Sequence, residues 1–337
     1  MTTPFEYITR ELHPDPCTST ALLYDDMDSQ SGRSLPIIYE PFDAARKAHW
    51  QDRGALFDFL LTTCGEGKRL LDFGPGDGWP SLIVAPFAAE VVGVDGSARR
   101  VSVCQENARR MGIANATFVH VPPGMMLPFE DGSFDGILAA SSVEQTPDPH
   151  ATLAELYRVL KHGGRLRIRY EALGRYRGGH EEDAWLLPLD AGRCRLILYD
   201  RHVREERVSQ VGLTFALPAA MLCQALDVPD RHALRFHDIT VAHLQQLRPA
   251  LREARLCQTV HPSGRTYHRF LREVGFQVVS PTHDGSHAAG ELFDALPPAS
   301  RPRDLAGVDA ILRPIVEIIT RLPAPVEGDP MMTAIKD

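Results

Sequence analysis

The sequence predicts an α/β protein built around a doubly wound, mostly parallel β-sheet, and two observations predict it. Short apolar segments alternate with helical segments from Arg69 onward, with short links between them. The first apolar segment runs directly into a glycine-rich turn, Gly74 to Gly78. Alternation of this kind is typical of parallel strands that form one sheet with helices on both faces.

Each element follows from the local pattern. The apolar segments expected to form the first five strands are Arg69–Phe73, Glu90–Asp95, Ala116–Val121, Phe134–Ala140 and Arg165–Tyr170. The clearest helix between them is Pro149–Leu160, because its leucines share one face and Asp148 is suited to cap its N-terminus. Two further strands are expected at Phe276–Ser280 and Met331–Lys336.

The regular alternation of strands and helices ends after residue 171. Alternating apolar residues in Cys194–Asp200 and Val211–Phe215 predict a β-hairpin, and residues 240–256 and 264–274 are expected to be helical. A later helical pattern contains Pro314, which is expected to kink or restart that helix.

These patterns divide the chain into four parts, two of which could cover a ligand cleft. The parts are an N-terminal helical or lid segment (1–65), a core (66–170), an inserted substrate cap with the hairpin (171–262) and a completion of the core sheet (263–337).

Composition excludes several classes of protein. Of the 337 residues, 44% are hydrophobic, which is enough for a sizeable core, and the net charge of −8 argues against a nucleic-acid partner. No apolar run reaches the roughly 18 residues of a membrane helix, and Met1–Cys17 does not have the pattern of a signal peptide. The six cysteines are scattered, as expected for reduced thiols of a cytoplasmic protein.

The glycine-rich turn is the strongest functional signal. A dinucleotide fingerprint would place a third glycine at position 79, which is Trp79, and the carboxylates of Asp72 and Asp77 would repel a diphosphate. The turn is better suited to a nucleoside that carries a cation and no phosphate. Asp95, at the end of the second strand, can accept both ribose hydroxyls. The alternative is a tight structural turn, with Asp95 as a helix cap.

Three segments with these motifs, Leu70–Gly78, Val91–Asp95 and Leu127–Leu166, resemble class I S-adenosylmethionine-dependent methyltransferases, in particular the group with a single compact domain. The resemblance covers residues 66–170. It implies a Rossmann-like sheet of seven strands with an antiparallel last strand. It also implies S-adenosylmethionine as the methyl donor and S-adenosylhomocysteine as the product.

The resemblance also assigns residues to the cofactor. It places Gly74 and Gly76 against the methionine part, and Asp72 near the ammonium group. Asp95 takes the ribose hydroxyls. The remaining positions are Gly96 and Ser97 beside the adenosine and Ser141 on the methionine side.

One position departs from the family pattern. The acidic residue that often accepts the adenine amino group is replaced by Pro123. A backbone carbonyl can take over that contact, and Met125 is expected to pack on the adenine face.

Three side chains are candidates for catalysis. Glu144, just after the fourth strand, could be a general base or hold a substrate amine; the alternative is a solvated loop carboxylate or a helix cap. Tyr39 could close over the donor or simply pack, and His180 is a candidate base.

Candidate acceptor-binding residues are Arg169, Tyr170 and Glu171, at the end of the fifth strand. Arg165, Arg167 and Arg169 alternate and therefore share one face of that strand, where unpaired charges would be costly. Either an anionic acceptor or the acidic residues of the insertion, Glu181, Glu182 and Asp183, would pair with them.

No metal is expected, because the histidine pairs His237/His243 and His261/His268 lack the spacing of ligands on one helix face. The sequence therefore predicts methyl transfer to a small-molecule acceptor. The alternatives are a macromolecular acceptor, or a non-catalytic cofactor-binding protein whose hairpin could support a homodimer.

Overall fold

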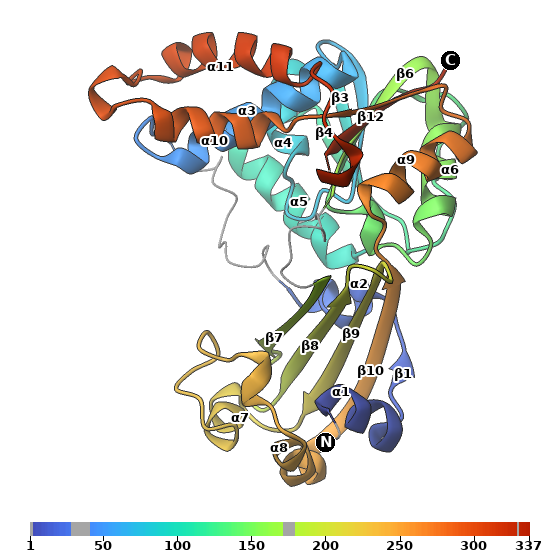
Figure 1. Ribbon diagram of the computed structural model, residues 1–337, viewed down its shortest axis with the longest axis vertical. Coiled ribbons are helices and arrows are strands. Elements are labelled where there is room, and N and C mark those ends of the chain that lie inside the picture. The colour runs from blue at the N-terminus through green and yellow to red at the C-terminus, as the bar shows by residue number, and fades with distance from the viewer. Residues whose placement is uncertain (1–2, 28–40, 171–178, 329) are drawn as a thin grey trace. The chain divides into compact units, whose positions relative to one another are not determined.

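Figure 1 shows the computed structural model, which describes residues 3–27, 41–170, 179–328 and 330–337. The chain divides into two compact units. The larger contains Met27–Gly174 and Pro262–Asp337, and the smaller contains Met1–Asp26 and Arg175–His261. Residues 1–65, predicted as one segment, thus contribute to both units.

The larger unit is built on a seven-stranded sheet in the order β11-β12-β6-β5-β2-β3-β4. Only β12 runs antiparallel to its neighbours, which confirms the predicted doubly wound, mostly parallel sheet. The strands are β2 (Arg69–Phe73), β3 (Glu90–Asp95), β4 (Ala116–His120), β5 (Phe134–Ala140), β6 (Leu160–Arg169), β11 (Val278–Thr282) and β12 (Met331–Ile335).

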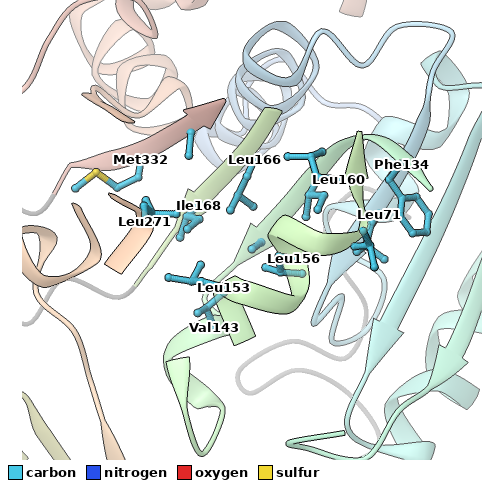
Figure 2. Packing of buried hydrophobic residues seen from close by; sticks show 14 of the residues in the cluster. Leu71, Phe134, Val143, Leu153, Leu156, Leu160, Leu166, Ile168, Leu271 and Met332 are labelled. Atoms are coloured by element: carbon cyan, nitrogen blue, oxygen red, sulfur yellow. The ribbon is translucent and has the colours of Figure 1, made fainter. Parts of the chain in front are cut away.

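Helices cover both faces of this sheet. Helix α6 (Pro149–Val159) begins as predicted, with the Asp148 carboxylate accepting from the Ala151 amide at 3.0 Å. It packs with α9 (Gly264–Val274) over one face of the sheet. Figure 2 shows part of this core, including Leu153, Leu156 and Leu166. Each buried leucine contributes about 2 kcal/mol.

A second apolar core lies around α3 (Lys47–Thr63), against which α10 (Gly285–Ala295) and α11 (Leu305–Ile319) pack. Helix α5 (Ala98–Met111) packs on the β3–β4 side. Helix α11 continues through Pro314, so the predicted restart there is wrong.

The smaller unit holds a five-stranded sheet in the order β1-β10-β9-β8-β7. The predicted hairpin strands correspond to β8 (Cys194–His202) and β9 (Arg207–Phe215), which lie inside the sheet between β7 (His180–Pro188) and β10 (Leu251–Val260). At the other edge of the sheet, β1 (Asp15–Pro16) brings the N-terminal segment beside β10.

The predicted helix over residues 240–256 is wrong in its second half. Helix α8 (Val241–Leu247) ends early, and β10 then pairs antiparallel with β9 along its whole length. The segment contains good helix formers, but pairing in the sheet and burial override that local preference. Within the described ranges, no helix has the length and apolar character that crossing a membrane would require.

Candidate functional site

The glycine-rich turn after β2 brings the backbone close to the chain that follows β5. Gly74, Gly76 and Gly78 all have positive φ, between 63° and 111°, which a glycine adopts without strain. A Cβ on Gly74 would lie 2.3 Å from the Cβ of Ser142. The turn therefore admits no side chain at Gly74. Its backbone lies at the carboxyl ends of the strands, where ligands bind in this fold class.

Asp72 is completely buried beneath this turn. Its Oδ2 accepts hydrogen bonds from the Ser81 amide at 2.9 Å and the Ser81 hydroxyl at 2.5 Å. Its Oδ1 has no hydrogen-bond partner among the described residues. Burial raises the pKa of Asp72 to about 7, even though the bonds from Ser81 favour the ionised form. One buried oxygen thus has no hydrogen-bond donor among the described residues.

Asp95, at the end of β3, fixes the other side of the turn. Its two oxygens accept from the amides of Gly76 at 3.2 Å and Ser97 at 2.9 Å. Burial raises the pKa of Asp95 to about 6. A carboxylate offers about four lone-pair sites, so this one has capacity for two further donors.

Two other predicted cofactor positions, Gly96 and Ser97, follow Asp95 directly. Gly96 offers its carbonyl to His120 Nε2 at 3.1 Å, and His120 lies opposite Asp95 in the β3–β4 pairing. Sequence reasoning missed His120, which only strand register reveals. The Ser97 hydroxyl caps α5 by accepting from the Arg100 amide at 3.2 Å. Met125, after β4, is 64% exposed and available for packing.

The carboxyl ends of β5 and β6 meet beside the turn. Ser141 has a φ of 52°, and its amide donates to the carbonyl of Arg169 at 2.6 Å. Glu144 is only 1% exposed, so it is not a solvated loop carboxylate. It accepts a hydrogen bond from the Tyr267 hydroxyl at 3.1 Å. Tyr170 is also buried, with its ring 4.6 Å from that of Tyr267.

Tyr267, on α9, was not predicted as a site residue. Burial, together with the nearby Glu144 charge, raises the pKa of Tyr267 well above its ordinary value. The hydroxyl therefore keeps its proton and donates a hydrogen bond to the Glu144 carboxylate. The two residues are far apart in the sequence, and no local pattern signals their contact.

The arginines of β6 have different partners from those expected. Arg167 is fully buried and forms two hydrogen bonds with Asp58 of α3, at 2.7 and 2.9 Å. The predicted pairing with acidic residues of the insertion is therefore wrong for Arg167. Glu181 instead lies 3.3 Å from Arg201 within the smaller unit.

Arg169 lies nearer to the glycine turn. Its guanidinium stacks over the Trp79 ring at 5.6 Å and approaches the Asp284 carboxylate at 3.4 Å. The side chain is 34% exposed, so it is accessible while two neighbours restrain it. Trp79 is itself anchored by a 3.0 Å hydrogen bond from its indole nitrogen to Asp52.

The other predicted residues lie elsewhere. Tyr39 and Glu171 fall outside the described residues. His180 belongs to the smaller unit, where its Nε2 lies 2.6 Å from Asp200.

These features fit a phosphate-free nucleoside with a cationic tail. The unpartnered Asp72 oxygen suits an ammonium group, and the spare lone pairs of Asp95 suit ribose hydroxyls. Gly74 leaves room for close approach of the ligand.

Comparisons with known proteins identify the same region. Residues 71–168 match the family model described as methyltransferase domain. The uncharacterized methyltransferase YcgJ of Bacillus subtilis is 34% identical over 105 residues, which is 31% of this chain and 41% of that protein. The ubiquinone/menaquinone biosynthesis C-methyltransferase UbiE of Geotalea uraniireducens is 35% identical over 106 residues, 31% of this chain and 45% of that protein.

Among solved structures, the CcbJ methyltransferase of Streptomyces caelestis aligns over 85% of this chain and 93% of its own. Its sequence identity is 12% and the TM-score is 0.47. This chain spans less than half the length of the two curated relatives named above.

Proposed function

Because residues 71–168 match the family model of a methyltransferase domain, we propose that this chain transfers a methyl group from S-adenosylmethionine to a small-molecule acceptor by in-line displacement. One observation carries the proposal. The glycine turn lies between two buried carboxylates, Asp72 and Asp95, which suit a nucleoside with a cationic tail and would repel a diphosphate.

S-adenosylmethionine supplies a methyl group already activated on a sulfonium centre. The chain's own residues then have to bind the donor and the acceptor, orient them for the displacement, and exclude water. Asp95 binds the ribose hydroxyls, and the backbone at Gly74 and Gly76 lies against the amino-acid part. Asp72 accepts from the ammonium group, and Met125 covers the base. The Ser141 backbone closes the methionine side.

Arg169 is the proposed anchor for an acidic or polar group of the acceptor. Its stacking on Trp79 and its contact with Asp284 hold the guanidinium in place while a third of the side chain stays exposed. Tyr170 and Glu171 follow it directly. The Arg169→Gln variant should raise the acceptor KM about tenfold with little loss of stability. A large fall in melting temperature with unchanged KM would contradict this role.

Glu144 is the proposed proton acceptor, and Tyr267 is its positioning residue. Glu144→Gln should lower kcat and leave the affinity for S-adenosylhomocysteine within about threefold of wild type. Tyr267→Phe removes the 3.1 Å bond and should shift the acidic limb of the kcat–pH profile, an effect that loss of packing alone would not produce. An unchanged profile would refute the positioning role.

Support for a small-molecule acceptor comes from the relatives. Their names include an arsenite methyltransferase, a menaquinone-pathway methyltransferase and a 27-O-demethylrifamycin SV methyltransferase. Turnover on small acceptors, measured by S-adenosylhomocysteine release, would support the proposal. Turnover that requires a protein or nucleic-acid fraction would overturn it.

The decisive first experiment is calorimetry with S-adenosylhomocysteine on the full chain. We expect one site with a Kd in the micromolar range or tighter, lost in Asp95→Ala. Absence of binding at high micromolar concentration would refute the proposed cofactor site.

A further inference from the structure

A second cluster of side chains lies on the smaller unit, independent of the site described above. It consists of His180 on β7 with Asp200 and His202 on β8. In the antiparallel register of these strands His180 is directly opposite His202. Asp200 is two residues before His202, so the period of a strand places all three side chains on one face.

The nitrogen and oxygen atoms of this cluster converge. Asp200 Oδ1 lies 2.6 Å from His180 Nε2 and 3.0 Å from His202 Nε2. The two imidazole rings are stacked, with centroids 4.3 Å apart and planes inclined by 21°. All three ligand atoms lie within 4.8 Å of one another. Neighbouring ligand atoms of a metal ion with bonds of about 2.1 Å are separated by about 3 to 3.4 Å, so the cluster is close to the size of a coordination sphere, with His180 and Asp200 drawn nearer by their hydrogen bond.

The surroundings orient the carboxylate. Arg207, on β9, approaches Asp200 Oδ2 at 3.5 Å and is itself held by Glu205 at 3.1 Å. His202 Nε2 also lies 3.2 Å from Oδ2, so Arg207 shares that oxygen with His202, while Oδ1 is the oxygen that both histidines approach most closely. An outer residue that orients a ligand in this way is common in metal sites.

The cluster is also accessible. The side chains of His180, His202 and Asp200 are 44%, 29% and 14% exposed. Water can therefore fill the remaining coordination positions, and an ion can enter without unfolding the strands.

We propose that His180, Asp200 and His202 bind a divalent transition-metal ion of the Zn²⁺ type. Two imidazole nitrogens and one carboxylate oxygen form a ligand set that such ions favour over Mg²⁺ or Ca²⁺. The bound ion joins the ends of β7 and β8 on the face that, further along the strands, carries the apolar core of the unit, including Ala184 and Leu198. The proposal does not depend on methyl transfer.

The test uses the full chain without an affinity tag, first stripped by a chelator. Equilibrium dialysis against Zn²⁺ alone measures stoichiometry and affinity, and visible absorption of the Co²⁺-loaded protein reports nitrogen–oxygen coordination. The variants are His180→Ala and His202→Ala, with His180→Gln as a milder change at the most exposed ligand. The matched control is His237→Ala. His237 Nε2 lies 3.6 Å from Asp238, and among the described residues His237 belongs to no group of three potential metal ligands.

We expect one equivalent of Zn²⁺ in the wild type and in His237→Ala, and at least about tenfold weaker binding in each ligand variant. Circular dichroism must show the wild-type fold in the variants that are compared. Binding that is absent in the wild type, or unchanged in both His180→Gln and His202→Ala, would overturn the proposal.

Discussion

The ionisation of Asp95 should control nucleoside binding. Burial raises the pKa of Asp95 to about 6, from an ordinary value of 3.8. Ribose hydroxyls donate to a carboxylate, so the ligand binds the ionised form. Affinity should therefore be constant above about pH 7 and should weaken as the pH falls through 6, with a proton released on binding near that pH.

The size of the effect follows from the pKa. At pH 5 about one tenth of the Asp95 side chains would be ionised, so the apparent Kd should rise about tenfold relative to pH 8, or about 1.4 kcal/mol. Acid unfolding through this group does not confound the measurement. Since its folded pKa lies above its unfolded pKa, lowering the pH toward 4 favours the folded state through Asp95.

The assay is calorimetry from pH 5 to 8 in buffers of different ionisation enthalpy, with two ligands. In the proposed site S-adenosylhomocysteine also faces Asp72, whose pKa of about 7 can steepen the profile. Adenosine lacks the amino-acid part and isolates Asp95. In Asp95→Asn the transition near pH 6 should vanish, and affinity at pH 8 should fall about tenfold to hundredfold. Adenosine affinity that is flat from pH 8 to 5 in the wild type would refute the assignment of Asp95 to the ribose.

Two further predictions concern the scaffold of the site. Gly74→Ala should destabilise the fold by more than about 3 kcal/mol in urea denaturation, because its Cβ would lie 2.3 Å from Ser142, whereas Gly67→Ala, with positive φ and open space, should cost only about 1–2 kcal/mol. Equal costs would show that the overlap is relieved elsewhere. Arg167→Met should cost about 3–5 kcal/mol, because it leaves the buried Asp58 carboxylate without its partner, and a loss below 1 kcal/mol would contradict the pairing.

The larger unit was predictable because its signals are local. Each parallel strand is a short apolar run, and the glycine turn and Asp95 lie at strand ends, where a ligand site of this fold class is expected. The Asp148 cap and the α9 boundaries also follow from neighbouring residues alone. For these elements, local preference and tertiary structure agree.

The partners of the buried charges were not predictable in the same way. Alternation placed Arg167 and Arg169 on one face of β6, which is correct for a strand. It could not show that Arg167 pairs with Asp58 of α3, or that Arg169 contacts Trp79 and Asp284. Such contacts depend on how helices pack on the sheet, and a single sequence carries no local record of that packing.

The smaller unit shows the same limit in its chemistry. A search for histidine ligands by helical spacing rejects His180 and His202, because they are far apart in the chain and neither has a partner one turn away. Antiparallel pairing of β7 and β8 places the two histidines directly opposite each other, and it does so in only one register. A shift of one residue would turn Asp200 to the other face of the sheet and away from His180. The cluster therefore exists only if the register of β7 and β8 is the one observed, and metal binding by both histidines would be independent evidence for that register.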